Sequence, residues 1–231
     1  MCSRCKTLII LMGPQGVGKT TLARTLHQRY AFLQRCRTAM IAADSANSIH
    51  TAYLRIISNL RGLHIKFYLD RPGVLCPDPQ VLSKLWVIEF LIGIFGHILA
   101  LLKLALLLLS HDVIIEHEGY TFKFVANFAY IQYMYANIIA KSRSTRRITR
   151  ALTLILTTAI QSLIRLSKLM KLRIYVINVQ STYNKLISRY RLRDSPVEPR
   201  HYIEFQLSIF NIIEELLRSL TRTINVAKVC T

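Results

Sequence analysis

The chain has 231 residues, enough for one α/β domain with a substantial core, and no Pro-, Gly- or Ser-rich linker divides it in two. Its formal net charge of +19 favours anionic partners such as nucleotides, nucleic acid or acidic lipid. Five cysteines with one close pair, Cys2 and Cys5, favour neither a disulfide framework nor a four-ligand zinc site over reduced thiols. We therefore predict a single domain over residues 1–231.

The first predicted strand, over 7–12, begins directly after a short N-terminal segment. That segment leaves no room for the charged and apolar regions of a secretory leader before folded structure begins. A cytoplasmic protein is expected.

A glycine-rich stretch follows this strand and matches the pattern G-x-x-x-x-G-K-T: Gly13-Pro14-Gln15-Gly16-Val17-Gly18-Lys19-Thr20. Placed between a strand and a helix, the pattern predicts a phosphate-binding loop. Glycines let successive backbone N–H groups converge on one polyphosphate, and the helix that starts at Thr20 adds its positive end.

The residues from Gly13 to Thr21 are therefore the candidate nucleotide-binding residues. Lys19 is expected to reach the β- and γ-phosphates of ATP, and the Thr20 hydroxyl to complete the coordination of Mg²⁺. ATP and Mg²⁺ are the expected cofactors.

The helix after the loop is predicted over 21–33. Its apolar residues recur at helical spacing and are expected to face the core: Leu22, Leu26, Tyr30 and Leu33.

Periodicity and turn residues indicate the remaining elements. Further strands are predicted over 38–43, 112–118, 172–179 and 224–229, with a short one at 65–69. Further helices are predicted from Ser45 or Asn47 to about residue 60, then over 83–109, 120–139, 146–163, 183–190 and 201–220.

The segment 83–109 is the most apolar of the chain, and its length could span a bilayer. Glu89 and Lys103 fall inside it, and a charge near a membrane centre is costly. A helix packed across the sheet or into a subunit interface is favoured, with membrane contact as the alternative. The basic run over 141–150 is interpreted as a solvated face, with contact to an anionic polymer or lipid surface as its alternative.

Glu116, at the end of the third long strand, is the leading acidic candidate for a place beside the Mg²⁺ or the acceptor, and Asp44 is the second. The plainer reading of Glu116 is a carboxylate that caps a helix or pairs with a lysine. The arginine-rich stretch over 189–200 is expected to form a lid that excludes water, with Arg189 and Arg193 as candidate catalytic residues.

The order of these features resembles the thymidylate kinase family of P-loop nucleoside monophosphate kinases. The resemblance rests on the loop and its helix, a strand ending in Glu116, the aromatic stretch Asn127-Phe128-Ala129-Tyr130-Ile131-Gln132, the arginine lid and a long last helix. Asp70-Arg71-Pro72-Gly73 is faintly similar to a stretch of that family that contacts the acceptor. The resemblance implies an α/β P-loop NTPase three-layer sandwich with a five-stranded parallel sheet. It also implies transfer of the γ-phosphoryl of ATP to the 5′-phosphate of thymidylate.

Carried over by position, Glu116 stands where that family has the acid of an Asp-Arg pair, and the arginines over 189–193 correspond to its lid. His117 stands in place of the family arginine, Asn178 in place of an aspartate, and Gln15 and Met12 in place of acids. His117 could replace an arginine only when it is protonated.

We expect a magnesium- and ATP-dependent kinase of a nucleoside monophosphate, with thymidylate as the leading acceptor and homodimer formation as an option. The alternatives are a basic ATPase or nucleotide switch that acts on a membrane or nucleic-acid surface, and a degenerate kinase that binds nucleotide without turnover.

Overall fold

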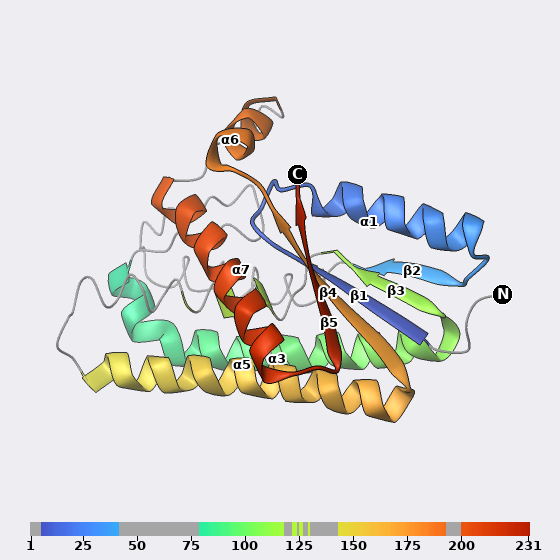
Figure 1. The fold of residues 1–231 in the computed structure, drawn as a ribbon. Coiled ribbons are helices and arrows are strands. Elements are labelled where there is room, and N and C mark those ends of the chain that lie inside the picture. The colour runs from blue at the N-terminus through green and yellow to red at the C-terminus, as the bar shows by residue number, and fades with distance from the viewer. Residues whose placement is uncertain are drawn as a thin grey trace, which may run out of the picture.

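A computed structural model describes residues 6–41, 79–117, 122–123, 125–126, 129, 143–192 and 200–231, without the side chains of 79–90, 92–93, 143–149, 151–152 and 155. In this part of the chain, five parallel strands form one sheet in the order β2-β3-β1-β4-β5 (Figure 1). The strands are β1 (Lys6–Met12), β2 (Thr38–Ile41), β3 (Val113–Glu116), β4 (Leu172–Gln180) and β5 (Ile224–Cys230). The predicted five-stranded parallel sheet is confirmed.

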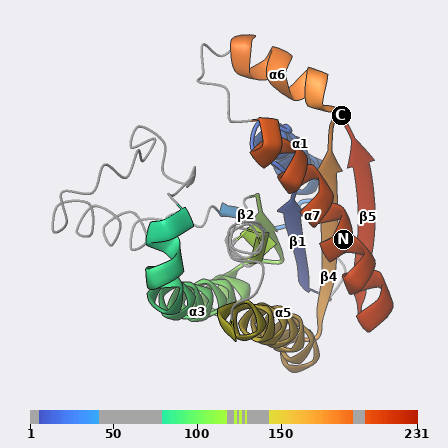
Figure 2. The same cartoon turned by 90° about the vertical axis from the view of Figure 1, so that its left-hand side faces the viewer.

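Helices cover both faces of this sheet in a three-layer arrangement (Figure 2). The helix α1 (Lys19–Gln28) and the π-helical turn η1 (Arg29–Leu33) lie on one face. On the other lie α3 (Pro79–Ser110), α5 (Arg143–Met170) and α7 (Arg200–Leu220), while α6 (Tyr183–Leu192) sits above the end of β4.

Successive side chains of β1 point to opposite faces of the sheet, and this alternation explains why a hydrophobic core lies on each face. Leu8 and Ile10 pack in the large cluster with α3, α5 and α7, whereas Ile9 and Leu11 pack against α1. Both sets are almost fully buried, as expected for a central parallel strand whose side chains point to opposite faces.

The direction in which successive strands are added to the sheet reverses at β1. The chain leaves β1 through α1 on one face, while α5, which leads from β3 to β4, lies on the opposite face. In open α/β sheets, ligands bind in the crevice that such a reversal leaves at the carboxyl ends of the strands. Here that crevice lies between β1 and its neighbour β3.

Two helix predictions differ in detail from the structure. Leu33, predicted to face the core, is 77% exposed because the wider winding of η1 rotates this turn away from the α-helical register. The helix predicted to end at Tyr190 continues to Leu192, so Arg189 is helical and does not belong to a loop.

The long apolar helix is confirmed as α3, and it packs alongside α5. Leu104 and Leu108 of α3 belong to the large core, and one face of the helix is thereby buried. No helix in the described ranges has both the length and the apolar character needed to cross a membrane.

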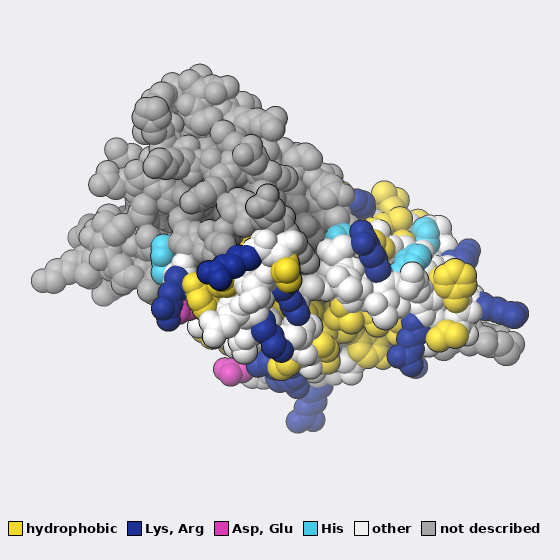
Figure 3. Space-filling view, turned by 90° about the horizontal axis from the view of Figure 1, so that it is seen from above, with side chains coloured by type: hydrophobic (Ala, Val, Ile, Leu, Met, Phe, Trp, Pro, Cys, Tyr) yellow, Lys and Arg dark blue, Asp and Glu magenta, His cyan; other side chains and the backbone are white. Residues whose placement is uncertain are grey.

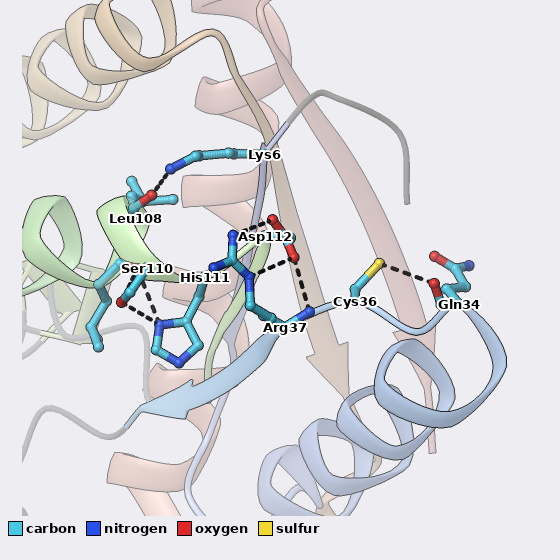
Figure 4. A network of polar contacts seen from close by, with 9 residues as sticks. Lys6, Gln34, Cys36, Arg37, Leu108, Ser110, His111 and Asp112 are labelled. Atoms are coloured by element: carbon cyan, nitrogen blue, oxygen red, sulfur yellow. Dashed lines mark hydrogen bonds and ion pairs between the residues drawn. The ribbon is translucent and has the colours of Figure 1, made fainter. Parts of the chain in front are cut away.

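A polar network ties β2 to β3 at the amino end of the sheet (Figure 4). The Arg37 backbone N–H and Nε donate to Asp112 Oδ2 at 3.0 and 3.3 Å, and Lys6 Nζ donates to the Leu108 carbonyl. The Arg37 guanidinium lowers the pKa of Asp112. Because this network lies at the edge away from the crevice, its role is to align strands.

Of the described cysteines, Cys36 is disulfide-bonded, which the cysteine spacing did not predict, and Cys230 is an exposed free thiol. The predictions for Cys2 and Cys5, Asp44, the strand 65–69, the stretch 70–73, most of the helix 120–139 and the lid residues 193–199 lie outside the described residues.

Candidate functional site

The loop Gly13–Thr20 forms a cradle at the carboxyl end of β1. Gly13, Gly16 and Gly18 have φ angles of 141°, 76° and 101°, a conformation that L side chains rarely adopt. A Cβ on Gly13 would lie 2.2 Å from the Val179 carbonyl oxygen, so a side chain has no room there. The sequence therefore specifies a tight loop whose backbone can approach a ligand closely.

Lys19 lies across this loop. Its Nζ donates to the carbonyl oxygens of Gly13 at 2.8 Å and of Pro14 at 2.6 Å. The ammonium group is thus held at the mouth of the cradle. Thr20 and Thr21, the first residues after it, are exposed at the start of α1.

Side chains from α6 and α7 hold the loop in place. Tyr190 donates its hydroxyl hydrogen to the Gln15 carbonyl at 3.3 Å, and Gln206 Oε1 accepts from the Gln15 N–H at the same distance. Arg189 Nη1 donates to the Val17 carbonyl at 2.9 Å. The Gln15 peptide is therefore fixed by two helices distant in sequence.

A cavity of about 410 Å³ opens above the loop. It is lined by loop and α1 residues, by the end of β3 and by the first turns of α7. Its described lining residues are Gly13, Gln15, Gly16, Gly18, Lys19, Thr20, Thr21, Arg24, His117, Lys123, Ala126, Gln206 and Phe210.

The cavity is electropositive. Lys19, Arg24 and Lys123 line it, and no described lining residue is acidic. The described surface seen from above also carries many Lys and Arg side chains and few carboxylates (Figure 3). Such a site attracts an anion, and three cations along its wall can neutralise more than one phosphate group.

His117 forms the wall on the β3 side. Its Nδ1 lies 2.9 Å and its backbone nitrogen 3.2 Å from the Ile41 carbonyl oxygen. A carbonyl only accepts hydrogen bonds, so the proton of a neutral ring sits on Nδ1 and Nε2 carries the lone pair. In this state His117 offers an acceptor atom and not the cation of an arginine.

Lys123 is positioned by the stretch that follows β3. Phe122, Val125 and Ala129 are buried, and the first two belong to the large core. Ala126 also belongs to the large core, and Lys123 and Ala126 both line the cavity. The core residues therefore anchor the backbone that carries Lys123.

The predicted site residues fall into three groups. Gly13, Gln15, Gly16, Gly18, Lys19, Thr20 and Thr21 line the cavity, whereas Pro14 and Val17 complete the loop without lining it. Arg189 contacts the loop, and Arg193 lies outside the described residues.

Glu116, the predicted acid, is 5% exposed in β3 opposite Ile10 of β1 and is not among the residues that line the cavity. Within the described ranges, no three His, Cys, Asp or Glu side chains gather closely enough to hold a metal ion. The side-chain oxygens of the described lining come from Gln15, Thr20, Thr21 and Gln206.

Sequence reasoning missed Arg24, Lys123, Gln206 and Phe210. Arg24 follows Thr20 by one helical turn, so helical spacing could have placed it at the loop. The other three come from segments whose approach to the loop depends on tertiary packing.

A buried network fixes α7 on β4 behind this cavity. Asn178, fully buried in β4, donates through Nδ2 to Glu214 Oε2 at 2.7 Å and to the Phe210 carbonyl at 3.3 Å. Arg218 pairs with Glu214 at 2.9 Å. Because Phe210 and Gln206 lie on the same helix, this network sets their positions in the cavity.

No family model matches the chain, and no curated protein is similar enough to be reported as a relative. The functional assignment consequently rests on the geometry of the cavity and on its chemistry.

Proposed function

We propose that this chain is a P-loop nucleotide kinase similar to thymidylate kinases, which transfers the γ-phosphoryl group of ATP to a nucleoside monophosphate. Thymidylate is the leading acceptor. The proposal combines two kinds of support: the motif and family resemblance of the sequence, and the cavity at the carboxyl ends of β1 and β3.

One observation carries it: the glycine cradle opens into an electropositive cavity at the reversal point of a parallel sheet. A polyphosphate fits this cradle because the positive φ angles of Gly13, Gly16 and Gly18 allow a tight loop on which backbone N–H groups can converge. Lys19 and Arg24 add positive charge beside them.

ATP, bound with Mg²⁺, supplies the transferable phosphoryl group, and the chain's residues bind and orient it. The loop N–H groups would hold the phosphates, Lys19 would neutralise charge that develops on the transferred group, and the Thr20 hydroxyl would be a ligand for Mg²⁺. Such positioning and charge stabilisation account for most of the catalysis in phosphoryl transfer.

The β3 side of the cavity is suited to the acceptor. Lys123 offers a cation for the acceptor phosphate, and the His117 ring, whose Nδ1 lies 2.9 Å from the Ile41 carbonyl oxygen, forms the wall on this side. Cations on two separate segments, Lys19 and Arg24 on α1 and Lys123 after β3, match a reaction that brings two anionic phosphates together.

The experiment is ADP release from ATP and Mg²⁺ across a panel of nucleosides and nucleoside monophosphates, with Lys19→Ala as the blank. Release that depends on thymidylate and is lost in Lys19→Ala supports the proposal. Release without an acceptor would instead support the ATPase alternative. ATP binding with no turnover would support a degenerate kinase, a result that the position of Glu116 outside the cavity lining would help to explain.

A further inference from the structure

Thr231, the residue after β5, joins parts of the chain that are far apart in the sequence (Figure 1). Its Oγ1 donates to the Val17 carbonyl oxygen of the loop at 3.0 Å and lies 3.1 Å from the Gln180 carbonyl oxygen at the end of β4. The same hydroxyl oxygen accepts from Arg189 Nη1 of α6 at 3.1 Å. This hydroxyl group thereby links the phosphate-binding loop to the sheet and to α6.

The main chain of Thr231 is held as well. Its N–H donates to the Gln180 carbonyl oxygen at 2.9 Å. Its carbonyl oxygen accepts from Ser181 Oγ at 3.0 Å and from Lys185 Nζ at 3.4 Å. Because main-chain and side-chain groups are both bonded, several contacts together fix the hydroxyl where it reaches the loop.

The Val17 carbonyl oxygen accepts a second hydrogen bond, from Arg189 Nη1 at 2.9 Å. Val17 is fully buried, and neither Arg189 nor Thr231 is among the described residues that line the cavity. The two donors therefore act on the loop itself and not as part of the described cavity wall.

The geometry of the peptide between Val17 and Gly18 shows what these donors do. In a trans peptide, the carbonyl oxygen and the N–H of the next residue point in opposite directions. This peptide is trans, and Gly18 lines the cavity. With its carbonyl bonded to Arg189 and Thr231, the peptide turns its N–H away from them. No described side chain caps α1 at Gly18, so a phosphate can take the place of a cap.

Arg189 also brings positive charge to this peptide. Its Nη1 lies 3.8 Å from the position that a Cβ would take on Gly18. A cation bonded to a carbonyl oxygen polarises the peptide and strengthens the hydrogen bond that the peptide N–H donates. The Gly18 N–H is therefore both oriented and made a better donor.

We infer that Arg189 and Thr231 are positioning residues for phosphate binding. Together they fix and polarise the peptide between Val17 and Gly18, so that its N–H contacts a phosphate group of the nucleotide. The inference rests on the proposed nucleotide binding, and it gives Arg189 a role through the loop in place of the predicted role as a catalytic lid residue.

The test is calorimetric titration of the full chain with ATP and Mg²⁺ and, separately, with inorganic tripolyphosphate. Thr231→Val removes the hydroxyl and is expected to raise the Kd for both ligands about 5- to 10-fold, whereas Thr231→Ser keeps it and should stay within about twofold of the wild type. Thr223→Val, at an exposed position before β5, is the matched control. All variants are expected to keep the circular dichroism of the wild type.

Arg189→Gln should raise both Kd values about 10- to 100-fold, because the lost donor is charged. Adding Thr231→Val to it should weaken binding by less than the product of the single effects, since both donors act on one carbonyl. Arg165→Gln, at an exposed position on α5, is the control and should bind as the wild type does.

Unchanged Kd values in Thr231→Val or in Arg189→Gln would overturn the inference and leave the proposed function standing. A loss seen with ATP and not with tripolyphosphate would assign Thr231 to the base of the nucleotide and would also overturn the inference. Weaker binding in both variants, with no phosphoryl transfer to thymidylate by the wild type, would support the inference and reject the proposed kinase. A wild type that binds neither ligand would overturn both.

Discussion

His97, buried between α3 and α5, should make the stability of this protein fall in mild acid. It is 8% exposed, and its Nε2 lies 3.2 Å from Ser162 Oγ. Burial lowers its pKa from 6.5 to about 4, because the charged ring would lose its hydration. The folded protein therefore keeps His97 neutral at pH values where the unfolded chain protonates it.

The magnitude follows from linkage. Between pH 6.5 and about 4 the unfolded state binds one more proton at this site, so the free energy of unfolding decreases as the pH falls through that window. At 1.36 kcal/mol per pKa unit, the full effect is about 3 kcal/mol, of which about 2 kcal/mol is lost between pH 7 and 4.5.

The assay is urea unfolding at both pH values, followed by far-ultraviolet circular dichroism. His97→Gln cannot titrate, so its stability should fall by about 2 kcal/mol less than that of the wild type over this interval. His201→Gln, at an exposed position on α7, serves as the control and should behave like the wild type. Equal pH dependence in His97→Gln and the wild type would refute the reasoning.

Three further variants test other parts of the account. Gly13→Ala should abolish ATP binding and destabilise the fold by about 3 kcal/mol or more, because the new Cβ would stand on a left-handed backbone and clash with the Val179 carbonyl. Equilibrium dialysis measures the binding and thermal unfolding measures the stability. Normal ATP binding by this variant would contradict the prediction. Glu214→Ala should lower the free energy of unfolding in urea by about 2–4 kcal/mol because Asn178 and Arg218 lose their partner. The control is Glu215→Ala at the exposed neighbouring position, which should change it by about 0.5 kcal/mol at most. Equal losses in the two variants would rule out a stabilising role for the network. Lys123→Met should raise the KM for thymidylate about 10- to 100-fold without changing the KM for ATP. Lys168→Met, at an exposed position on α5, is the control. An unchanged KM for thymidylate would show that Lys123 does not bind the acceptor.

Sequence patterns predicted the sheet well because each strand is an apolar run. They predicted α5 and α7 by a 3.6-residue period and α3 by its long apolar run. The loop is predictable for the same local reason, since its glycines, Lys19 and Thr20 act within eight consecutive residues. Leu33 was misplaced because a π-helical turn has no distinct signal in the hydrophobic pattern.

The cavity walls depend on distant contacts and could not be predicted. Gln206 reaches Gln15 across 191 positions, and nothing near either residue signals the contact. Glu116 was expected at the ligand because its strand neighbours β1; the strand pairing is correct, yet its side chain does not line the cavity. A strand end indicates the edge of a sheet, whereas side-chain direction depends on the alternation of faces along the strand.

The most direct test of the central claim is the fate of the γ-phosphoryl group of labelled ATP incubated with thymidylate, Mg²⁺ and the wild-type chain. We predict labelled thymidine diphosphate, formed by the wild type and absent with Lys19→Ala. Label that appears only as inorganic phosphate, or that remains on ATP, would contradict the assignment of this chain as a nucleotide kinase.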